Sequence, residues 1–287
     1  MLQNPISQDN QLFKGNGVLY HYTTFNSFKS IMKDLTLLPS SFEKLNDMNE
    51  GNVFNLDLNQ NFKVINESEK LIKGHCHILC FSQNYDVQGC EIEGTNHPAM
   101  WAHYADNSNG VCLVIDKDAF IKANKDILSH HFYKFEDVEY SFFNSPYDNN
   151  INYEVVTPRG FIMDNWKFLF YQKHKDWENE NEHRLFIMDY DGKFSIKDCV
   201  KKIVLGRKVF RNHNRIKEVL DMIVNSGFSC YREFIPHSFY TTCYGLDGYS
   251  TFSIALQIET IIRGNIYNPN YANYKKWLEE EQGYCCL

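Results

Sequence analysis

The chain has 287 residues, 43% of them hydrophobic and 15% aromatic, and its formal net charge is −7, which predicts a globular protein with a sizeable core. The acidic balance argues against general binding to a nucleic-acid backbone, which usually shows as a basic excess, although a nucleic acid could still be a substrate. No signal peptide or membrane span of roughly 18 apolar residues is expected, and nine scattered cysteines favour reduced thiols, so the sequence predicts a cytoplasmic protein without membrane contact.

The apolar patterns of the first half predict short strands and helices. A strand is expected at 17–22, a helix with one apolar face at 25–35, a second short strand at 35–41 and a polar loop at 41–51. Continuous apolar runs at 77–82 and 110–116 predict two more strands, with a short helix and a turn between them.

The second half continues this mixture. An irregular excursion is expected at 140–156, a helix at 159–177, strands in the second half of 178–188 and at 200–206, and an amphipathic helix at 214–227. Closing strands are expected at 237–245 and 249–256, and a last helix at 268–283. Because strands outnumber helices without strict alternation, the sequence predicts an α+β fold. We expect one domain at 17–264, after a tail at 1–16 and before a helical extension at 265–287.

The tightest cysteine cluster is "GHCHILCF", which contains His75, Cys76, His77 and Cys80. In a strand the two histidines lie on one face and the two cysteines on the other. No second C-x-x-C pair elsewhere completes a tetrahedral zinc site, so a buried strand without a metal is the preferred interpretation.

The strongest pattern for chemistry lies at Glu180, Glu182 and Arg184. In a strand all three share one face. Two neighbouring carboxylates repel, which raises the pKa of one, whereas Arg184 would hold one carboxylate ionised in a fixed orientation. The alternative is a solvated edge strand with charge pairing, and Trp177 just upstream favours a cleft.

A second pattern, His21 followed by Tyr22, ends the first predicted strand. A histidine at such a place is more often structural than catalytic. Its ring can nevertheless donate a hydrogen bond to a sugar hydroxyl, and a neighbouring tyrosine can stack on a flat ring. With a distant glutamate these groups suit a nucleoside, because a carboxylate stabilises cationic character at the anomeric carbon.

Two further polar segments are open to both structural and functional interpretations. Asn46, with Asp47 and Glu50, does not fit an EF-hand, so turn or capping roles are the stronger interpretation. Trp101 and Tyr104 lie three residues apart on one helical face, which is usual for core packing, with His103 on the other side.

Taken together, six segments resemble a bacterial family that has only a domain-of-unknown-function label. They are "LYHYTTFNSFKSIMKD", "SSFEKLNDMNEG", "CFSQN", "MWAHYADNSNGVCLVID", "KDWENENEHRLF" and "VKKIVLG". The family's Trp-x-His-Tyr-Ala and Trp-x-x-Glu-x-Glu-x-Arg patterns match at 101–105 and 177–184. The resemblance spans 19–206, and the chain departs from it at Met48-Asn49, where Pro-Phe is usual.

A more distant resemblance is to the ADP-ribosyltransferase fold, which binds NAD in a cleft of a split β-sheet core with flanking helices. It implies that His21 contacts a ribose of NAD and that Tyr22 or Tyr104 lies near the nicotinamide ring. Glu182 would then bind the ribose hydroxyl and Glu180 would orient the acceptor. Glu180-Asn181-Glu182 resembles the Glu-x-Glu turn of the arginine-modifying members of this fold. Of the Ser-Thr-Ser motif of that subgroup, "CFSQN" offers only Ser82. The other residues expected to bind NAD are Thr23, Asn46, Trp101, His103 and Arg184.

The leading hypothesis is therefore an enzyme that cleaves NAD, its substrate, and transfers ADP-ribose to a protein or nucleic acid. A role as a toxin or phage-defence effector, with an antitoxin or regulatory partner, follows by analogy alone. One alternative is a nucleotide-sensing or protein-binding module with an inactive site. The last alternative is a metal-dependent nuclease that uses Asp47, Glu50, Glu180 and Glu182.

Overall fold

The computed structural model describes residues 17–42, 62–87, 90–142, 151–210, 212–226 and 233–236. These residues divide into two compact units, each assembled from segments far apart in the sequence. The first unit takes its residues from 1–35, 83–123 and 196–287, and the second from 36–82 and 124–195. The expectations for the tail at 1–16, for Asn46 and its loop, and for the chain after 236 lie outside the described residues, and the single domain stays a prediction.

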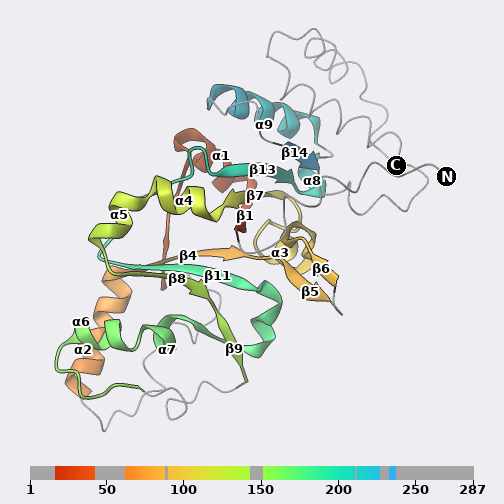
Figure 1. Ribbon diagram of the computed structural model, residues 1–287. Coiled ribbons are helices and arrows are strands. Elements are labelled where there is room, and N and C mark those ends of the chain that lie inside the picture. The colour runs from red at the N-terminus through yellow and green to blue at the C-terminus, as the bar shows by residue number, and fades with distance from the viewer. Residues whose placement is uncertain are drawn as a thin grey trace. The chain divides into compact units, whose positions relative to one another are not determined.

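The first unit contains four strands of the main sheet, which neighbour one another in the order β14-β13-β7-β1 (Figure 1). Its strands are β1 (Val18–Thr24), β7 (Gly110–Asp116), β13 (Val200–Leu205) and β14 (Glu233–Pro236). Neighbouring strands run antiparallel, except that β13 and β14 are parallel. A hairpin of β5 (Tyr85–Val87) and β6 (Cys90–Ile92) forms a separate sheet.

Helix α1 (Phe25–Asp34) follows β1 directly. It begins after Thr24, whose side-chain oxygen accepts a hydrogen bond from the Ser27 amide at 3.2 Å, and it ends at Leu35 in a left-handed conformation. The apolar face of α1 is buried, as its periodicity predicts. The other helices in the described part of this unit are η4 (Gly94–Asn96), α3 (Pro98–His103), α4 (Lys117–Ala123), α8 (Arg207–Phe210) and α9 (His213–Asn225).

The described part of the second unit contains four strands of the main sheet and two separate strand pairs. The four strands neighbour one another in the order β3-β4-β11-β8, and adjacent strands among these four are antiparallel. Its strands are β3 (Ser40–Ser41), β4 (Cys76–Ser82), β11 (Glu182–Met188) and β8 (Tyr133–Asp137). Strand β9 (Glu139–Ser141) pairs in parallel with β10 (Gln172–His174), and β2 (Thr36–Leu37) pairs with β12 (Phe194–Ser195).

The core of the second unit lies between its sheet and three helices, α2 (Phe62–His75), α6 (Pro158–Asp164) and α7 (Trp166–Phe170). The rings of Phe170 on α7 and Phe186 on β11 are stacked, with centroids 4.1 Å apart. All seven residues of β11 are buried, so the polar residues at its start are buried as well. The remaining helices among the described residues of this unit are α5 (Lys125–His130) and η6 (Lys175–Glu180).

The α+β class is confirmed, as are the predicted strands at β1, β4, β7 and β13 and the helices α1 and α9. The single helix at 159–177 is wrong, because the segment forms α6, α7, β10 and the start of η6. Asn165 separates α6 from α7, and its side-chain amide donates to the Phe161 carbonyl at 2.9 Å. Beyond α7, pairing with β9 makes residues 172–174 extended. The strand expected at 35–41 is split into β2 and β3 around Pro39, which has no N–H to donate.

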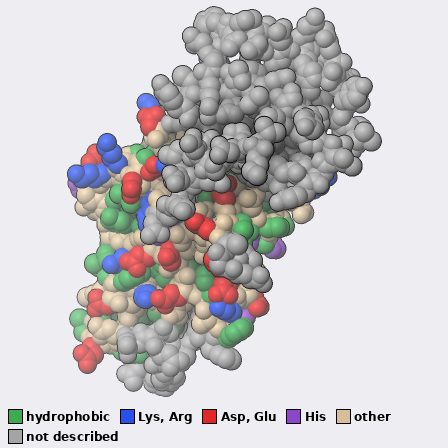
Figure 2. All heavy atoms as spheres, turned by 45° about the vertical axis from the view of Figure 1, so that its right-hand side comes forward, with side chains coloured by type: hydrophobic (Ala, Val, Ile, Leu, Met, Phe, Trp, Pro, Cys, Tyr) green, Lys and Arg blue, Asp and Glu red, His purple; other side chains and the backbone are tan. Residues whose placement is uncertain are grey.

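Acidic and basic side chains are interspersed on the described part of the face in Figure 2, in keeping with the modest net charge of the sequence. None of the helices in the described part of the chain combines the length and apolar character that crossing a bilayer requires.

Candidate functional site

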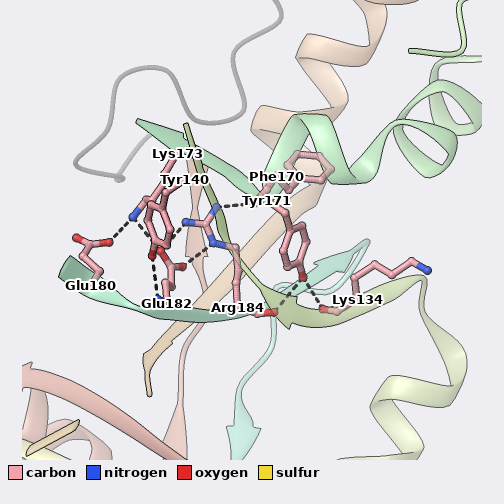
Figure 3. Close-up of polar contacts among 8 residues, drawn as sticks. All are labelled: Lys134, Tyr140, Phe170, Tyr171, Lys173, Glu180, Glu182 and Arg184. Atoms are coloured by element: carbon pink, nitrogen blue, oxygen red, sulfur yellow. Dashed lines mark hydrogen bonds and ion pairs between the residues drawn. The ribbon is translucent and has the colours of Figure 1, made fainter. Parts of the chain in front are cut away.

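Four buried charges in the second unit form the charged cluster, which consists of Lys173, Glu180, Glu182 and Arg184 (Figure 3). Their exposed fractions are 5%, 6%, 4% and 0%, in that order. Lys173 lies on β10, Glu180 ends η6, and the other two open β11. Burying a charge is costly unless it is paired, so the pairing inside this cluster decides its properties.

Arg184 holds the carboxylate of Glu182 with two donors. Its Nε lies 2.6 Å from Glu182 Oε1, and its Nη2 lies 2.9 Å from Oε2. The remaining nitrogen, Nη1, donates to the carbonyl of Phe170 at 2.6 Å. A planar guanidinium in this bidentate arrangement fixes both the place and the plane of the carboxylate. The predicted pairing of Arg184 with a neighbouring carboxylate is therefore confirmed.

Lys173 is shared by both carboxylates of the cluster. Its Nζ lies 2.8 Å from Glu182 Oε2 and 2.5 Å from Glu180 Oε2. The ammonium also faces the ring of Trp177 at 5.7 Å from the centroid. With two cations and two carboxylates, the formal charge of the cluster is balanced.

Glu180 does not lie in a strand with Glu182, which corrects the expectation that both share one strand face. Asn181 adopts a left-handed conformation with φ 42° and separates η6 from β11. Asparagine tolerates this conformation better than most residues. The hydroxyl of Ser82 donates to the Glu180 carbonyl at 2.7 Å, and Ser82 lies opposite Glu182 in the β4–β11 register. The two carboxylates therefore meet through the turn.

The charges around Glu182 keep it ionised. Burial by itself would raise the pKa of this carboxyl, but the positive charges of Arg184 and Lys173 outweigh burial and lower the pKa from 4.5 to about 2. A hydrogen bond from Cys80 acts in the same direction. Burial and the charge of Glu182 raise the pKa of Cys80 well above its usual range, so its thiol stays protonated.

Two tyrosines fix the backbone beneath the cluster. The Glu182 amide donates to the Tyr140 hydroxyl at 2.9 Å. The hydroxyl of Tyr171 lies 2.9 Å from the Arg184 carbonyl and 2.8 Å from the Lys134 carbonyl. Burial raises the pKa of both phenols, which remain neutral donors and acceptors. Hydrogen bonds with these tyrosines therefore hold the backbone of β11 at Glu182 and at Arg184.

Sequence reasoning missed Lys173, Cys80 and Tyr140 as members of this site. Lys173 fell inside the helix expected at 159–177, and its pairing with Tyr140 across the parallel strands β9 and β10 is non-local. Cys80 was weighed only as a metal ligand. A lysine nine residues before a glutamate is no local signal, so only the fold brings these groups together.

Six further predicted site residues, His21, Tyr22, Thr23, Trp101, His103 and Tyr104, belong to the first unit. Tyr22 and Trp101 are buried in a cluster of apolar side chains, the aromatic cluster. Their rings meet there edge to face, with centroids 5.1 Å apart. The Tyr22 hydroxyl donates to the carbonyl of Gly94, and Trp101 Nε1 donates to the Thr95 carbonyl at 2.7 Å. The members of this cluster are Tyr20, Tyr22, Met100, Trp101, Ala105, Cys112, Val114 and Val204.

The remaining candidates of the first unit differ in exposure. On β1, Thr23 is buried and His21 half-buried, opposite Val111 and Leu113 of β7 respectively. On α3 and just after it, His103 is exposed and Tyr104 packs against the aromatic cluster, as the helical spacing predicts. Their roles toward a ligand stay predictions.

Residues 76–82 form the largely buried strand β4. His75 ends α2, which corrects the expectation that His75 and His77 lie on one face of a strand. Among the residues that the structure describes, no group of three or more His, Cys, Asp or Glu side chains is placed to hold a metal ion. Two of the glutamates that the nuclease hypothesis needs, Glu180 and Glu182, are engaged by Lys173. Its other two residues, Asp47 and Glu50, lie outside the described residues.

The fold and the cluster define an α+β protein in which a buried glutamate is fixed by an arginine and a lysine. Within residues 100–185, which include the whole charged cluster, the chain matches a family described as "Protein of unknown function (DUF2971)". The structure is similar to a chain described as "Thermus sp. 2.9 DarT in complex with NAD+", with 10% identity, a TM-score of 0.34, and coverage of 78% of this chain and 96% of that chain. No curated protein matches the chain in sequence.

Proposed function

We propose that this protein is an NAD-consuming, ADP-ribosyltransferase-like enzyme with Glu182 as its catalytic carboxylate. The observation that supports this most directly is the ionised carboxylate of Glu182, fixed by Arg184 and Lys173 at the start of β11. The resemblance of 180–182 to the Glu-x-Glu turn of arginine-modifying ADP-ribosyltransferases supplies the substrate class.

The proposed reaction breaks the bond between nicotinamide and the ribose of NAD. Nicotinamide leaves as a neutral molecule with the bonding electron pair, and positive charge develops on the ribose. An ionised carboxylate beside the ribose stabilises that charge, because a preorganised charge needs no reorganisation during the reaction. A nucleophile of the acceptor then bonds to the anomeric carbon and loses its proton, so the products are nicotinamide, ADP-ribosylated acceptor and one proton.

Other residues keep their predicted roles in this proposal. Glu180 orients the acceptor, and His21 contacts a ribose of NAD. The remaining residues proposed to bind NAD are Tyr22, Thr23, Asn46, Ser82, Trp101, His103, Tyr104 and Arg184. The acceptor is a protein or a nucleic acid, and we propose a biological role as a toxin or phage-defence effector restrained by an antitoxin or regulatory partner.

The decisive experiment is nicotinamide release from labelled NAD by the full chain, alone and with protein or nucleic-acid acceptors analysed by mass spectrometry. Glu182→Gln keeps the shape of the side chain and removes its charge, so we expect release to fall at least about 100-fold. Unchanged release by Glu182→Gln would show that the catalytic assignment is wrong.

The matched control is Glu178→Gln. Glu178 lies on η6, four residues before Glu182, but its side chain is 56% exposed and pairs with Lys175. This control is expected to release nicotinamide like the wild type. Circular dichroism and thermal melting of both variants separate a lost reaction from a lost fold.

The second candidate function is a nucleotide-sensing or protein-binding module with an inactive site. It is favoured by one observation, which is that both oxygens of Glu182 already accept hydrogen bonds from Arg184, and one also accepts from Lys173. Isothermal titration calorimetry with NAD and other nucleotides distinguishes the two candidates, because binding without nicotinamide release identifies the module.

A further inference from the structure

Lys173 contacts both carboxylates of the charged cluster. Its ammonium lies 2.5 Å from Glu180 Oε2 and 2.8 Å from Glu182 Oε2. Strand β10 fixes its backbone by parallel pairing with β9, in which Lys173 is the register partner of Tyr140. Tyr140 in turn accepts the amide hydrogen of Glu182. The same two strands therefore position the ammonium and the backbone of the glutamate.

We infer that Lys173 is a positioning residue for Glu182, and that its ammonium keeps Glu182 a carboxylate in the presence of the second acidic side chain, Glu180. This inference rests on the proposed function and deepens it. It makes the local charge balance, and not Arg184 alone, responsible for the ionised state of Glu182.

The neighbours of Glu182 show why Lys173 is required. Among the residues that the structure describes, the charged and titratable groups that face it are Arg184 on β11, Lys173 on β10, Glu180 on η6, Cys80 on β4, Tyr140 on β9 and Tyr171 after α7. The thiol and the two phenols are neutral near pH 7, because burial raises the pKa of each. The ionisation of Glu182 therefore depends on two cations and one further carboxylate.

Loss of the ammonium changes this balance from zero to one net negative charge. Two buried carboxylates would then share the remaining guanidinium, and repulsion between like charges raises the pKa of at least one of them. Loss of the ammonium together with the charge of Glu180 restores the balance, since Glu182 and Arg184 remain as a bidentate pair. A residue that only filled space would not produce this reversal.

The test is a carboxyl ¹³C NMR titration of the full chain labelled at glutamate, with the Glu182 signal assigned by its loss in Glu182→Gln. In the wild type we expect Glu182 to stay ionised to the lowest pH at which the chain is folded. In Lys173→Met its apparent pKa is expected to rise by about one unit or more. In Lys173→Met/Glu180→Gln it is expected to return toward the wild-type value.

Two further variants keep the test decisive. Lys173→Arg retains the charge and is expected to keep Glu182 ionised, whereas Lys175→Met removes a partly exposed lysine of η6 that pairs with Glu178 and is expected to change nothing. If Lys173→Met does not fold, the double variant and Lys173→Arg still report the charge balance. The inference would be overturned if Lys173→Met is folded and Glu182 has the same pKa in it as in the wild type. It would also be overturned if the Glu182 pKa in Lys173→Met/Glu180→Gln does not return toward the wild-type value.

Failure of the positioning role and failure of the proposed function give different experimental results. If the wild type releases no nicotinamide but the Glu182 titration shifts as described, the proposed function fails and the positioning role stands. If Glu182→Gln abolishes release but Lys173→Met leaves the Glu182 pKa and the pH profile of release unchanged, the proposed function stands and the positioning role fails. If the proposed function and the positioning role both hold, the acid limb of the pH profile of nicotinamide release shifts to higher pH in Lys173→Met, in step with the Glu182 pKa.

Discussion

The charged cluster of the second unit and the aromatic cluster of the first are both buried, yet they depend on different physics. The rings of Tyr22 and Trp101 are stabilised by packing, which tolerates many partners of suitable size. Glu182 and Arg184 have lost nearly all contact with water, and each depends on a specific partner at hydrogen-bond distance. A buried ring is therefore weak support for a ligand site. A buried, fixed carboxylate is stronger support, because it provides a negative charge in a fixed position that can stabilise positive charge during a reaction.

The largest effect is expected from Arg184→Met. This change leaves Glu182 with one cation and removes the donor to the Phe170 carbonyl. Breaking a buried ion pair from one side costs about 3–5 kcal/mol, so we expect the free energy of unfolding in urea at pH 7 to fall by that amount.

The control for Arg184→Met is Lys201→Met. Lys201 pairs with Asp116 at 2.7 Å, but the two side chains are 41% and 28% exposed. Surface pairs contribute about 0–1 kcal/mol, so this variant should differ little from the wild type. Equal losses in the two variants would contradict the distinction between buried and exposed pairs.

A smaller loss of folding stability is expected at low pH. Because the pKa of Glu182 is lowered from 4.5 to about 2 on folding, the unfolded chain binds a proton more readily than the folded chain between these values. The contribution of the Glu182 carboxylate to the free energy of unfolding is fully present above about pH 5 and is lost as the pH falls. The expected loss of stability between pH 7 and pH 3 is about 2 kcal/mol. Urea unfolding of the wild type and Glu182→Gln at several pH values measures it.

The comparison with Glu182→Gln is needed because other carboxyls titrate in the same range. Hydrogen bonding to Arg159 lowers the pKa of Asp189. Burial by itself would raise the pKa of Asp116, but hydrogen bonds from the Ala119 amide and Lys201 outweigh it and lower that pKa. These groups are present in both chains and cancel in the difference. If the stability difference between the two chains stays constant from pH 7 to pH 3, the ionised state of Glu182 is not a source of stability.

The two clusters also differ in how well the sequence predicts them. Apolar periodicity is a local signal, so α1, α9 and the packing of Trp101 and Tyr104 follow from spacing alone. The contact between Glu182 and Arg184 also follows from spacing, because they lie two residues apart in one strand. The contact with Lys173 does not, because it depends on the parallel pairing of β9 and β10 and on the left-handed turn at Asn181.

The smallest effect is expected in the aromatic cluster, from Tyr22→Phe. This change keeps the ring against Trp101 and removes the hydroxyl that donates to the buried Gly94 carbonyl. The close fit there leaves little room for a replacement donor, since a Cβ at Gly94 would lie 2.2 Å from the ring of Tyr20. We expect a loss of about 1–2 kcal/mol in the free energy of unfolding, because one buried acceptor is left without its donor.

Tyr85→Phe is the matched control, since the Tyr85 hydroxyl also donates to a backbone carbonyl, that of Asn96 at 2.9 Å, but from a more exposed position. Water can replace this hydroxyl, so the loss should be smaller than for Tyr22→Phe. Calorimetric titration of NAD into Tyr22→Phe then separates the roles of the ring and the hydroxyl. Unchanged affinity together with lower stability places the hydroxyl in the core. A clear loss of affinity at wild-type stability would instead assign it to the ligand, and a buried ring would then have a function that packing alone does not reveal.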